Sequence, residues 1–433
     1  MPPSEEALEA LAEDFTAGFR EQPGPIRRVG IEAEFPVVTD DGRAGDIAPL
    51  WPALLEDSSF QPDYDDPETR SLVVAARRPG TALGAEVGRA TLELSLGPYD
   101  DLWELKAGLD AVLEHTSAVA RTRGLALLGF GIQPRTPPSA ALMTPRRHYR
   151  ALLHAAGRAW LPLTTTASSQ LHVDIARPEL VAAVNVMNLL SGPLIAFAAN
   201  SSVYAGRAGR SLSGREALLA GLGEHRYGMT PRRLGSPLDL VGYLTEFPCH
   251  VLPRGATFLS VGIPFRRWLA GEAARRSRAD LYRDFLWHEH YVWNSARART
   301  QHSTIEVRPA CQQPAGALLA PHALSLGWVE SLSDVEHYFA DALGPDPWPA
   351  MMRFRRRAIQ DGLEAEAPAL HMLAELLEIA RRGLVSRNRK EEEFLDPIAA
   401  RLEQGENPAL QARDLFRRRG MQSLIRAVRI ETP

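Results

Sequence analysis

Four segments of the chain alternate apolar and polar residues with a period of two, which is the pattern of a β-strand with one buried face. In the first segment, every second residue from Val29 to Phe35 is apolar, and Glu32 and Glu34 lie on the opposite face. A continuous apolar run at 124–132 predicts one more, fully buried strand. The alternating segments are VGIEAEFPVV (29–38), RATLELSL (89–96), TTTASSQLHVDI (164–175) and TIEVR (304–308) within 293–314.

Apolar residues at helical spacing predict helices between these strands and throughout the end of the chain. The segment 40–70 is rich in Asp, Pro and Ser and predicts loops around a short helix at Pro49–Leu55. The expected helices are 4–20, 100–123, 178–199, 316–343, 348–362, 367–383, 390–404 and 407–428.

Irregular connections separate the strands, and no Gly-x-Gly-x-x-Gly follows a strand. We therefore expect an α+β fold with an antiparallel sheet rather than a Rossmann fold. We expect the chain to divide into an N-terminal helix in 1–25, a catalytic sheet domain in 26–315, and a helical C-terminal region in 316–433 packed on that domain.

Composition narrows the function classes. The 433 residues carry 49 Lys and Arg against 53 Asp and Glu, and a net charge of −4 gives no electrostatic footprint for nucleic-acid binding. The longest apolar stretch, Leu189–Ala199, is interrupted by Ser, Gly and Pro and is too short to span a membrane. Two cysteines, Cys249 and Cys311, and an acidic N-terminus unlike a signal peptide predict a reduced, cytoplasmic protein.

Lysine is nearly absent, since only Lys106 and Lys390 occur among the 49 cationic residues. Neither lies in a P-loop or in the strand context of a protein kinase. If the protein handles a nucleotide, metal ions and arginines therefore have to hold its phosphates.

Acidic side chains recur on the polar faces of the alternating strands. If these strands share one sheet, their polar faces converge into a ring of hard oxygen ligands of the kind that Mg²⁺ prefers. Arg308, two residues beyond the last carboxylate, points to the same side and could hold a phosphate. A solvated sheet face is the alternative interpretation, and the pattern alone does not decide between the two. The side chains are Glu32, Glu34, Glu93 and Glu306, with Gln170 and His172 on the third strand.

Five motifs in their order along the chain resemble the glutamate–cysteine ligase family, in the branch shared by plant, proteobacterial and actinobacterial enzymes. GIEAEF (30–35) resembles the family's Gly-x-Glu-x-Glu strand, and EVGRATLELS (86–95) resembles its Glu-Pro-Gly-x-Gln-x-Glu-Leu-Ser segment. TTTASSQLHVDI resembles Thr-x-Thr-x-Gln-x-x-x-Asp, and TIEVRPACQQP resembles the Ile-Glu-x-Arg strand. FAANSSVYAGRAGRSLSGRE (197–216), with RYG at 226–228, resembles the Ala-Asn-Ser-Pro segment and the arginines after it.

The resemblance implies a fold akin to glutamine synthetase, with a curved antiparallel sheet that forms a funnel. It also implies an ATP- and Mg²⁺-dependent carbon–nitrogen ligase that joins a carboxylate to an amine through an acyl phosphate. Carried over by motif, the metal ligands are Glu32, Glu34, Glu93 and Glu306. Other carried-over positions are Glu86 near the cofactor, Gln170 and His172 in the substrate site, Arg308 at a phosphate, and Arg226 near the substrate or the nucleotide phosphates.

The substrate side departs from the family pattern. Family enzymes carry an Arg-Tyr-x-x-Met motif linked to the amino-acid carboxylate, but here His148 precedes Tyr149 and a leucine replaces the methionine. Arg147 or Arg150 would then substitute for the family arginine beside Tyr149. We therefore expect a ligase with a glutamate-like carboxylate and an amine that the sequence leaves open. The alternatives are glutamate–cysteine ligase proper, a guanidino-group kinase, and a degenerate homologue that only binds.

Overall fold

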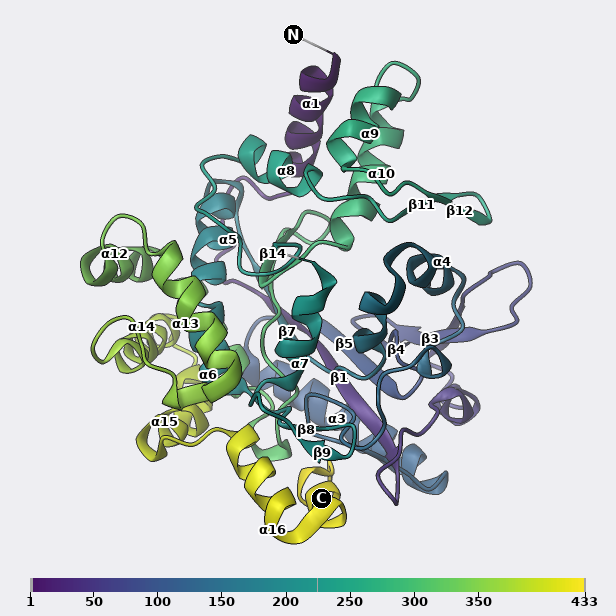
Figure 1. Ribbon diagram of the computed structural model, residues 1–433, viewed down its shortest axis with the longest axis vertical. Helices are drawn as coiled ribbons and strands as arrows, with labels where there is room; N and C mark the ends of the chain where they lie inside the picture. The colour runs from purple at the N-terminus through teal and green to yellow at the C-terminus, as the bar shows by residue number, and fades with distance from the viewer. Residues whose placement is uncertain (1–2, 224, 432–433) are drawn as a thin grey trace.

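The computed structural model describes residues 3–223 and 225–431 and confirms an α+β fold built on an antiparallel sheet. Within these residues the main sheet is open and follows the order β14-β15-β7-β1-β5-β4-β3-β2, with β6 also paired to β1 (Figure 1). Every strand pairing in this sheet is antiparallel. Its strands are β1 Val29–Thr39, β2 Gln61–Tyr64, β3 Val73–Arg78, β4 Thr81–Ala85, β5 Thr91–Tyr99, β6 Leu125–Leu127, β7 Ser169–Asp174, β14 Ala296–Arg299 and β15 Thr304–Val307.

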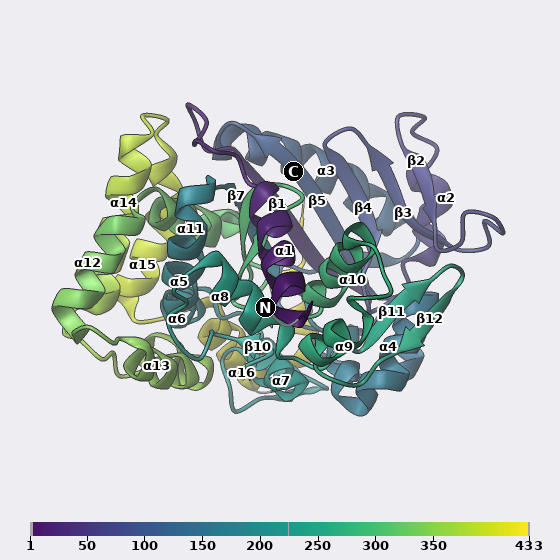
Figure 2. The same ribbon diagram turned by 90° about the horizontal axis from the view of Figure 1, so that it is seen from above.

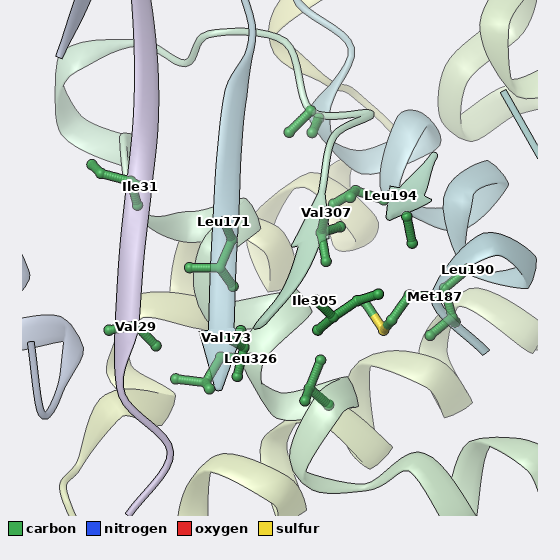
Figure 3. Packing of buried hydrophobic residues seen from close by; sticks show 14 of the residues in the cluster. Val29, Ile31, Leu171, Val173, Met187, Leu190, Leu194, Ile305, Val307 and Leu326 are labelled. Carbon is green, nitrogen blue, oxygen red and sulfur yellow. The ribbon is translucent and has the colours of Figure 1, made fainter. Parts of the chain in front are cut away.

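The apolar face of the sheet forms part of the largest core cluster. Alternate residues of β1, β7 and β15 point to one side, where they meet the helices that follow them in the chain (Figure 3). Figure 3 labels Val29, Ile31, Leu171, Val173, Ile305 and Val307 from the strands, and Met187, Leu190, Leu194 and Leu326 from the helical side. Because one face is buried in this way, the register of the strands is fixed and their polar residues all project to the opposite face.

Helices surround the sheet unevenly. α3 packs along β5 and β6, while α5, α6 and the C-terminal helices gather beside the β7 side of the sheet, as Figure 2 shows. α1, α8, α9 and α10 form a separate group of mutually packed helices near the N-terminus. The first ten helices are α1 Pro3–Ala17, α2 Trp51–Leu54, α3 Leu102–Thr122, α4 Arg147–Ala156, α5 Leu180–Leu189, α6 Ser191–Ala198, α7 Gly214–Leu219, α8 Pro237–Thr245, α9 Phe265–Glu272 and α10 Arg278–His290.

The C-terminal helices join the sheet through a continuous core, and α11 contacts β7 directly. α11 and α14 cross at two glycines: a Cβ on Gly327 would lie 2.2 Å from the carbonyl oxygen of Ala380, and one on Gly383 would lie 2.1 Å from that of Gly327. The helices of this region are α11 Ala320–Glu330, α12 Leu332–Leu343, α13 Trp348–Asp361, α14 Met372–Ser386, α15 Asp396–Gln404 and α16 Pro408–Val428.

Short strand pairs complete the fold around the site. The β11–β12 hairpin stands beside α4 and α10 (Figure 1). Strand β10 pairs with β13 in parallel. These strands are β8 Val203–Tyr204, β9 Arg207–Ala208, β10 Tyr227–Gly228, β11 Val251–Arg254, β12 Thr257–Ser260 and β13 Trp293–Asn294.

The structure divides the predicted helix 316–343 between α11 and α12 at Ser331, and it corrects the local prediction in other places as well. The segment 40–70 contains strand β2, whose Pro62 is tolerated because β2 is the edge of the sheet. The run at 124–132 forms a strand only over Leu125–Leu127. The predicted helix 178–199 is divided between α5 and α6 around Leu190, because Pro193 has no N–H to donate to an uninterrupted helix.

Among the described helices, no single one has the length and apolar composition needed to cross a membrane. The segments Arg177–Leu189 and Ser191–Ala198 reach that length and composition only as a pair, which is bent by 47°.

Candidate active site

Strand register brings the predicted acidic residues together at the centre of the sheet. Glu34 on β1 faces Glu93 on β5, and Glu32 on β1 faces Gln170 on β7. Glu306 on β15 faces His172 on β7. The polar faces therefore converge as their alternation predicted, and they separate into two groups rather than one.

The first group, called here the tri-glutamate cluster, consists of Glu34, Glu86 and Glu93, with one oxygen from each lying within 4.8 Å of the others. Glu34 accepts hydrogen bonds from the backbone N–H of Ser168 at 2.6 Å and from Gln170 Nε2 at 3.1 Å. Burial and the neighbouring Glu86 raise the pKa of Glu34 to about 7. Burial and two neighbouring carboxylates, those of Glu32 and Glu86, raise the pKa of Glu93 well above its ordinary value.

The tri-glutamate cluster thus concentrates negative charge that its surroundings compensate only in part. Hard oxygen donors at this spacing are the ligands that Mg²⁺ takes in proteins, and a divalent cation would supply the missing counter-charge. The residues of this cluster fit such an ion.

The second group, called here the histidine cluster, consists of Glu32, His172 and Glu306, again with one ligand atom each within 4.8 Å. His172 Nε2 lies 3.2 Å from Glu32 Oε1, and its Nδ1 lies 3.2 Å from Thr304 Oγ1. Burial works to raise the pKa of Glu32, but the hydrogen bond and charge of His172 outweigh it and leave that pKa lowered. Two carboxylates and one imidazole make a mixed oxygen and nitrogen ligand set.

Glu306 is surrounded by three arginines. Its carboxylate accepts hydrogen bonds from Arg297 Nη2 at 2.7 and 2.9 Å and from Arg308, and Arg299 Nε lies 3.4 Å away. Burial opposes ionisation, but these cations hold the pKa of Glu306 well below its ordinary value. The arginines also face a cavity, so they can bind an entering phosphate while Glu306 keeps its charge.

Two cavities meet at the clusters, and both are lined by Glu32 and Glu93. The larger has a volume of about 690 Å³ and the smaller about 550 Å³, both within the usual range of small-molecule sites. The smaller cavity runs along β1, β4 and β5 past Gly30, Gly80 and His172. The larger extends from the tri-glutamate cluster toward α4, α7 and α10.

The wall of the larger cavity combines aromatic rings with arginines. Trp160 packs with Tyr149, Tyr291 and Trp293 at centroid distances of 5.8–6.2 Å. These rings form one of the molecule's apolar clusters and give the cavity an apolar part of its wall. The arginines that line it are Arg146, Arg215, Arg283, Arg297, Arg299 and Arg308.

Most residues expected from the sequence lie at this junction. The larger cavity is lined by Glu32, Glu34, Glu86, Glu93, Tyr149, Gln170 and Arg308. His172 lines the smaller cavity, and Glu306 lies beneath the arginine layer with 1% of its surface exposed.

Arg147 and Arg150 lie outside the cavity wall. Arg147 donates to the backbone carbonyl of Asp65 at 2.7 Å and to that residue's carboxylate at 3.3 Å, while Arg150 is exposed and reaches the carbonyl of Pro145 at 3.3 Å. Arg146 lines the cavity instead, with its guanidinium 5.3 Å from the centroid of the Tyr149 ring. Helix α4 begins at Arg147, whereas Arg146 before it has an extended backbone, so the two side chains point in different directions. Sequence spacing could not show this difference.

Arg226 is also placed away from both cavities. It donates to the backbone carbonyls of Tyr291 at 2.7 Å and of Pro248, and it lies over the ring of Phe247. Burial lowers the pKa of Arg226 to about 10. In the structure it joins backbone segments and does not face the carboxylates.

Sequence reasoning missed Arg146, Arg215, Arg297, Arg299 and Tyr227 in the cavity wall. Arg297 and Arg299 alternate on β14 as Glu306 and Arg308 do on the neighbouring strand, so the period-two pattern of ARAR was the signal that could have identified them. Arg215 belongs to the segment 197–216, which was recognised only as a motif.

The fold and its site define a class, that of α+β proteins with carboxylates gathered on one face of an antiparallel sheet. The structure resembles the crystal structure of glutamate–cysteine ligase from Francisella tularensis in complex with AMP, with a TM-score of 0.54 over 94% of this chain and 88% of that chain. The two sequences are 13% identical, so this likeness concerns the fold alone.

Residues 28–428 match the model of glutamate–cysteine ligase family 2, and the chain belongs to that family. The chloroplastic glutamate–cysteine ligase A of Oryza sativa subsp. japonica is 23% identical over 376 residues, which cover 84% of this chain and 75% of the relative. The chloroplastic glutamate–cysteine ligase of Medicago truncatula is 24% identical over 389 residues, covering 86% and 75%. The protein is accordingly an ATP-dependent carboxylate–amine ligase.

Proposed function

We propose that this ligase joins the carboxylate of glutamate, or of a closely similar amino acid, to an amine through an acyl phosphate. The observation that carries the proposal is the position of the two carboxylate clusters at the junction of two cavities. One cavity can then hold the nucleotide and the other the two substrates, with the reacting atoms at the junction.

The smaller cavity is the proposed nucleotide site, because it opens beside His172 and its wall includes the backbone of Gly30, Gly80 and Gly97. The phosphates would reach the histidine cluster, where Arg297 and Arg308 can turn from Glu306 toward phosphate oxygens. Mg²⁺ held by the carboxylates of both clusters would neutralise the phosphates during transfer.

In the first step, an oxygen of the substrate carboxylate attacks the γ-phosphorus of ATP, and ADP leaves. In the second step, the amine attacks the carbonyl carbon of the acyl phosphate, inorganic phosphate leaves, and the nitrogen loses a proton. The chain's part is positioning, charge neutralisation and exclusion of water from the acyl phosphate. The rings of Trp160, Tyr291 and Trp293 support the last of these roles, because they wall the larger cavity with apolar surface.

Arg146, with Tyr149 and Gln170, is the proposed anchor for the amino-acid carboxylate, in place of Arg147 or Arg150. All three line the larger cavity, as do the residues of the tri-glutamate cluster. Both cysteines are buried free thiols, which suits the cytoplasmic location that the composition leads us to propose.

ADP release measured with ATP, Mg²⁺ and amino acids singly and in pairs tests the proposal, with mass spectrometry of the products. We expect release that requires both glutamate and an amine, and a product lighter than their sum by one water. If cysteine is the amine, the reaction is that of glutamate–cysteine ligase proper. A phosphorylated product without an amide, or ATP binding without turnover on any pair, would contradict the proposal.

A further inference from the structure

A buried ion-pair network lies behind the wall of the larger cavity, outside both carboxylate clusters. Glu216 in α7 is 1% exposed, and its Oε1 accepts hydrogen bonds from Arg215 Nη1 at 2.6 Å and Tyr227 Oη at 2.5 Å. Its other oxygen, Oε2, accepts from Arg355 Nη2 at 2.5 Å. Arg215 and Tyr227 line the cavity, whereas Glu216 and Arg355 do not. One carboxylate oxygen of Glu216 therefore holds two side chains of the cavity wall, Arg215 and Tyr227. The other oxygen binds Arg355, which lies behind the wall and is called here the anchor.

The anchor is fixed by close backbone packing. Arg355 belongs to α13 of the C-terminal region, which presses on α6 so tightly that a Cβ on Gly192 would lie 2.9 Å from Phe354 Cδ1 and 3.2 Å from Arg355 Cα. At the other end of the side chain, a Cβ on Gly228 (φ +91°) would lie 2.9 Å from three atoms of the guanidinium. The two glycines allow the helix and the guanidinium to approach, and they leave Arg355 little room to move.

The network gives the two wall groups opposite hydrogen-bonding roles. Because Tyr227 donates its hydroxyl proton to Glu216, only lone pairs of its oxygen are free to accept a bond from a ligand. Burial and the charge of Glu216 raise the pKa of Tyr227 well above its ordinary value, so the hydroxyl keeps this proton. Arg215 has only N–H groups to offer, and its charge is held between Glu216 and the tri-glutamate cluster.

We infer that Glu216 and Arg355 are positioning residues, which hold two wall groups for an amino-acid substrate: Arg215 as a second donor, beside Arg146, for the carboxylate, and Tyr227 as an acceptor for the ammonium group. The inference rests on the proposed function and adds to it a second layer of the site, supplied in part by the C-terminal helices. Neither positioning residue touches the substrate. They affect the affinity for the amino acid and not the affinity for the nucleotide. The proposed nucleotide cavity is the smaller one, which shares only Glu32 and Glu93 with the larger cavity.

Steady-state kinetics of Glu216→Gln and Arg355→Met test the inference, with Arg357→Met as the matched control. Arg357 is on the same helix, but it pairs with Glu366 at the surface. We expect Glu216→Gln to raise the KM for the amino acid about 100-fold and Arg355→Met about 10-fold, with the KM for ATP within about 2-fold of wild type. Arg355→Lys, which keeps the charge, restores most of the loss. The double variant Glu216→Gln/Arg355→Met is expected to have the same KM for the amino acid as Glu216→Gln alone, because Arg355 acts only through Glu216.

Equal changes in both KM values, or none, would overturn the inference while leaving the ligase activity in place. If the wild-type protein itself releases no ADP, the proposed function fails, and the positioning is then read from crystal structures of wild type and Glu216→Gln. Arg215 or Tyr227 turned away from the wild-type position supports the inference. Both side chains unmoved in the variant overturn it.

Discussion

The two carboxylate clusters lie on the same sheet face and handle negative charge in opposite ways. In the histidine cluster the protein supplies its own cations, since Glu306 is ringed by Arg297, Arg299 and Arg308. In the tri-glutamate cluster the negative charges of neighbouring carboxylates repel one another. Burial and the charge of Glu86 raise the pKa of Glu34 to about 7. The difference indicates that the histidine cluster is prepared for phosphates, toward which its arginines can turn, and the tri-glutamate cluster for a cation.

The largest effect is expected when Glu306 is removed from the histidine cluster. Glu306→Ala leaves Arg297 and Arg308 without their carboxylate partner and leaves Arg299 paired with Glu289 alone. Removing one partner of a buried pair costs about 3–5 kcal/mol. We expect a loss of that size in the free energy of unfolding, measured with urea, together with loss of ADP release. A variant that unfolds within about 1 kcal/mol of wild type would show that the arginines are not compensated by Glu306.

Removing a carboxylate from the tri-glutamate cluster is expected to change the free energy of unfolding in the opposite direction. Glu93→Gln removes one of the repelling charges but keeps the shape, so the metal-free protein should gain about 1 kcal/mol or stay unchanged. The same variant should lose the rise in melting temperature that MgCl₂ gives wild type. Thermal unfolding with and without MgCl₂ measures both effects. A destabilised Glu93→Gln protein that still responds to Mg²⁺ would contradict the assignment of this cluster.

Stability should depend on pH through Glu34. Its pKa is raised in the folded protein from 4.5 to about 7, so its contribution is fully present below pH 4.5 and is lost as the pH rises through 7. In the absence of metal this amounts to about 3 kcal/mol between pH 4.5 and pH 8. Urea unfolding of wild type and Glu34→Gln across that range isolates the effect, because the variant lacks the titrating group. Parallel profiles for the two proteins would count against the raised pKa.

A further effect concerns the cavity wall outside the clusters. Arg146→Met should raise the KM for the carboxylate substrate about 10- to 100-fold, as expected for loss of a hydrogen bond between charged groups. Arg150→Met is the matched control, since Arg150 is exposed and four residues away. We expect the control to stay within about 2-fold of wild type. A larger rise in KM for Arg150→Met than for Arg146→Met in steady-state kinetics would assign the substrate carboxylate to Arg150.

Sequence pattern predicted the part of the site that depends on strand geometry. Alternation places Glu32 and Glu34 on one face of β1, and once the strands share one antiparallel sheet the same face carries Glu93 and Glu306. The same pattern could not divide the acids into two clusters, because the division depends on which strands are neighbours in the sheet.

Residues on loops and helix ends were beyond such reasoning. Arg146, Arg147 and Arg150 are close in sequence, but only the local path of the chain at the start of α4 decides which one faces the cavity. Arg226 matched a family motif and yet bonds backbone carbonyls. Long-range partners such as Arg355 and Glu216, 139 residues apart, carry no local signal at all.

The contrast between the clusters is tested most directly by anomalous diffraction from crystals soaked in Mn²⁺, with and without ADP. Without nucleotide we expect an anomalous peak between Glu34, Glu86 and Glu93, because only that cluster needs a cation. With ADP we expect a second peak beside Glu32, His172 and Glu306 as phosphates draw the arginines away. Crystals in which the tri-glutamate cluster binds no Mn²⁺ under either condition would contradict the central claim.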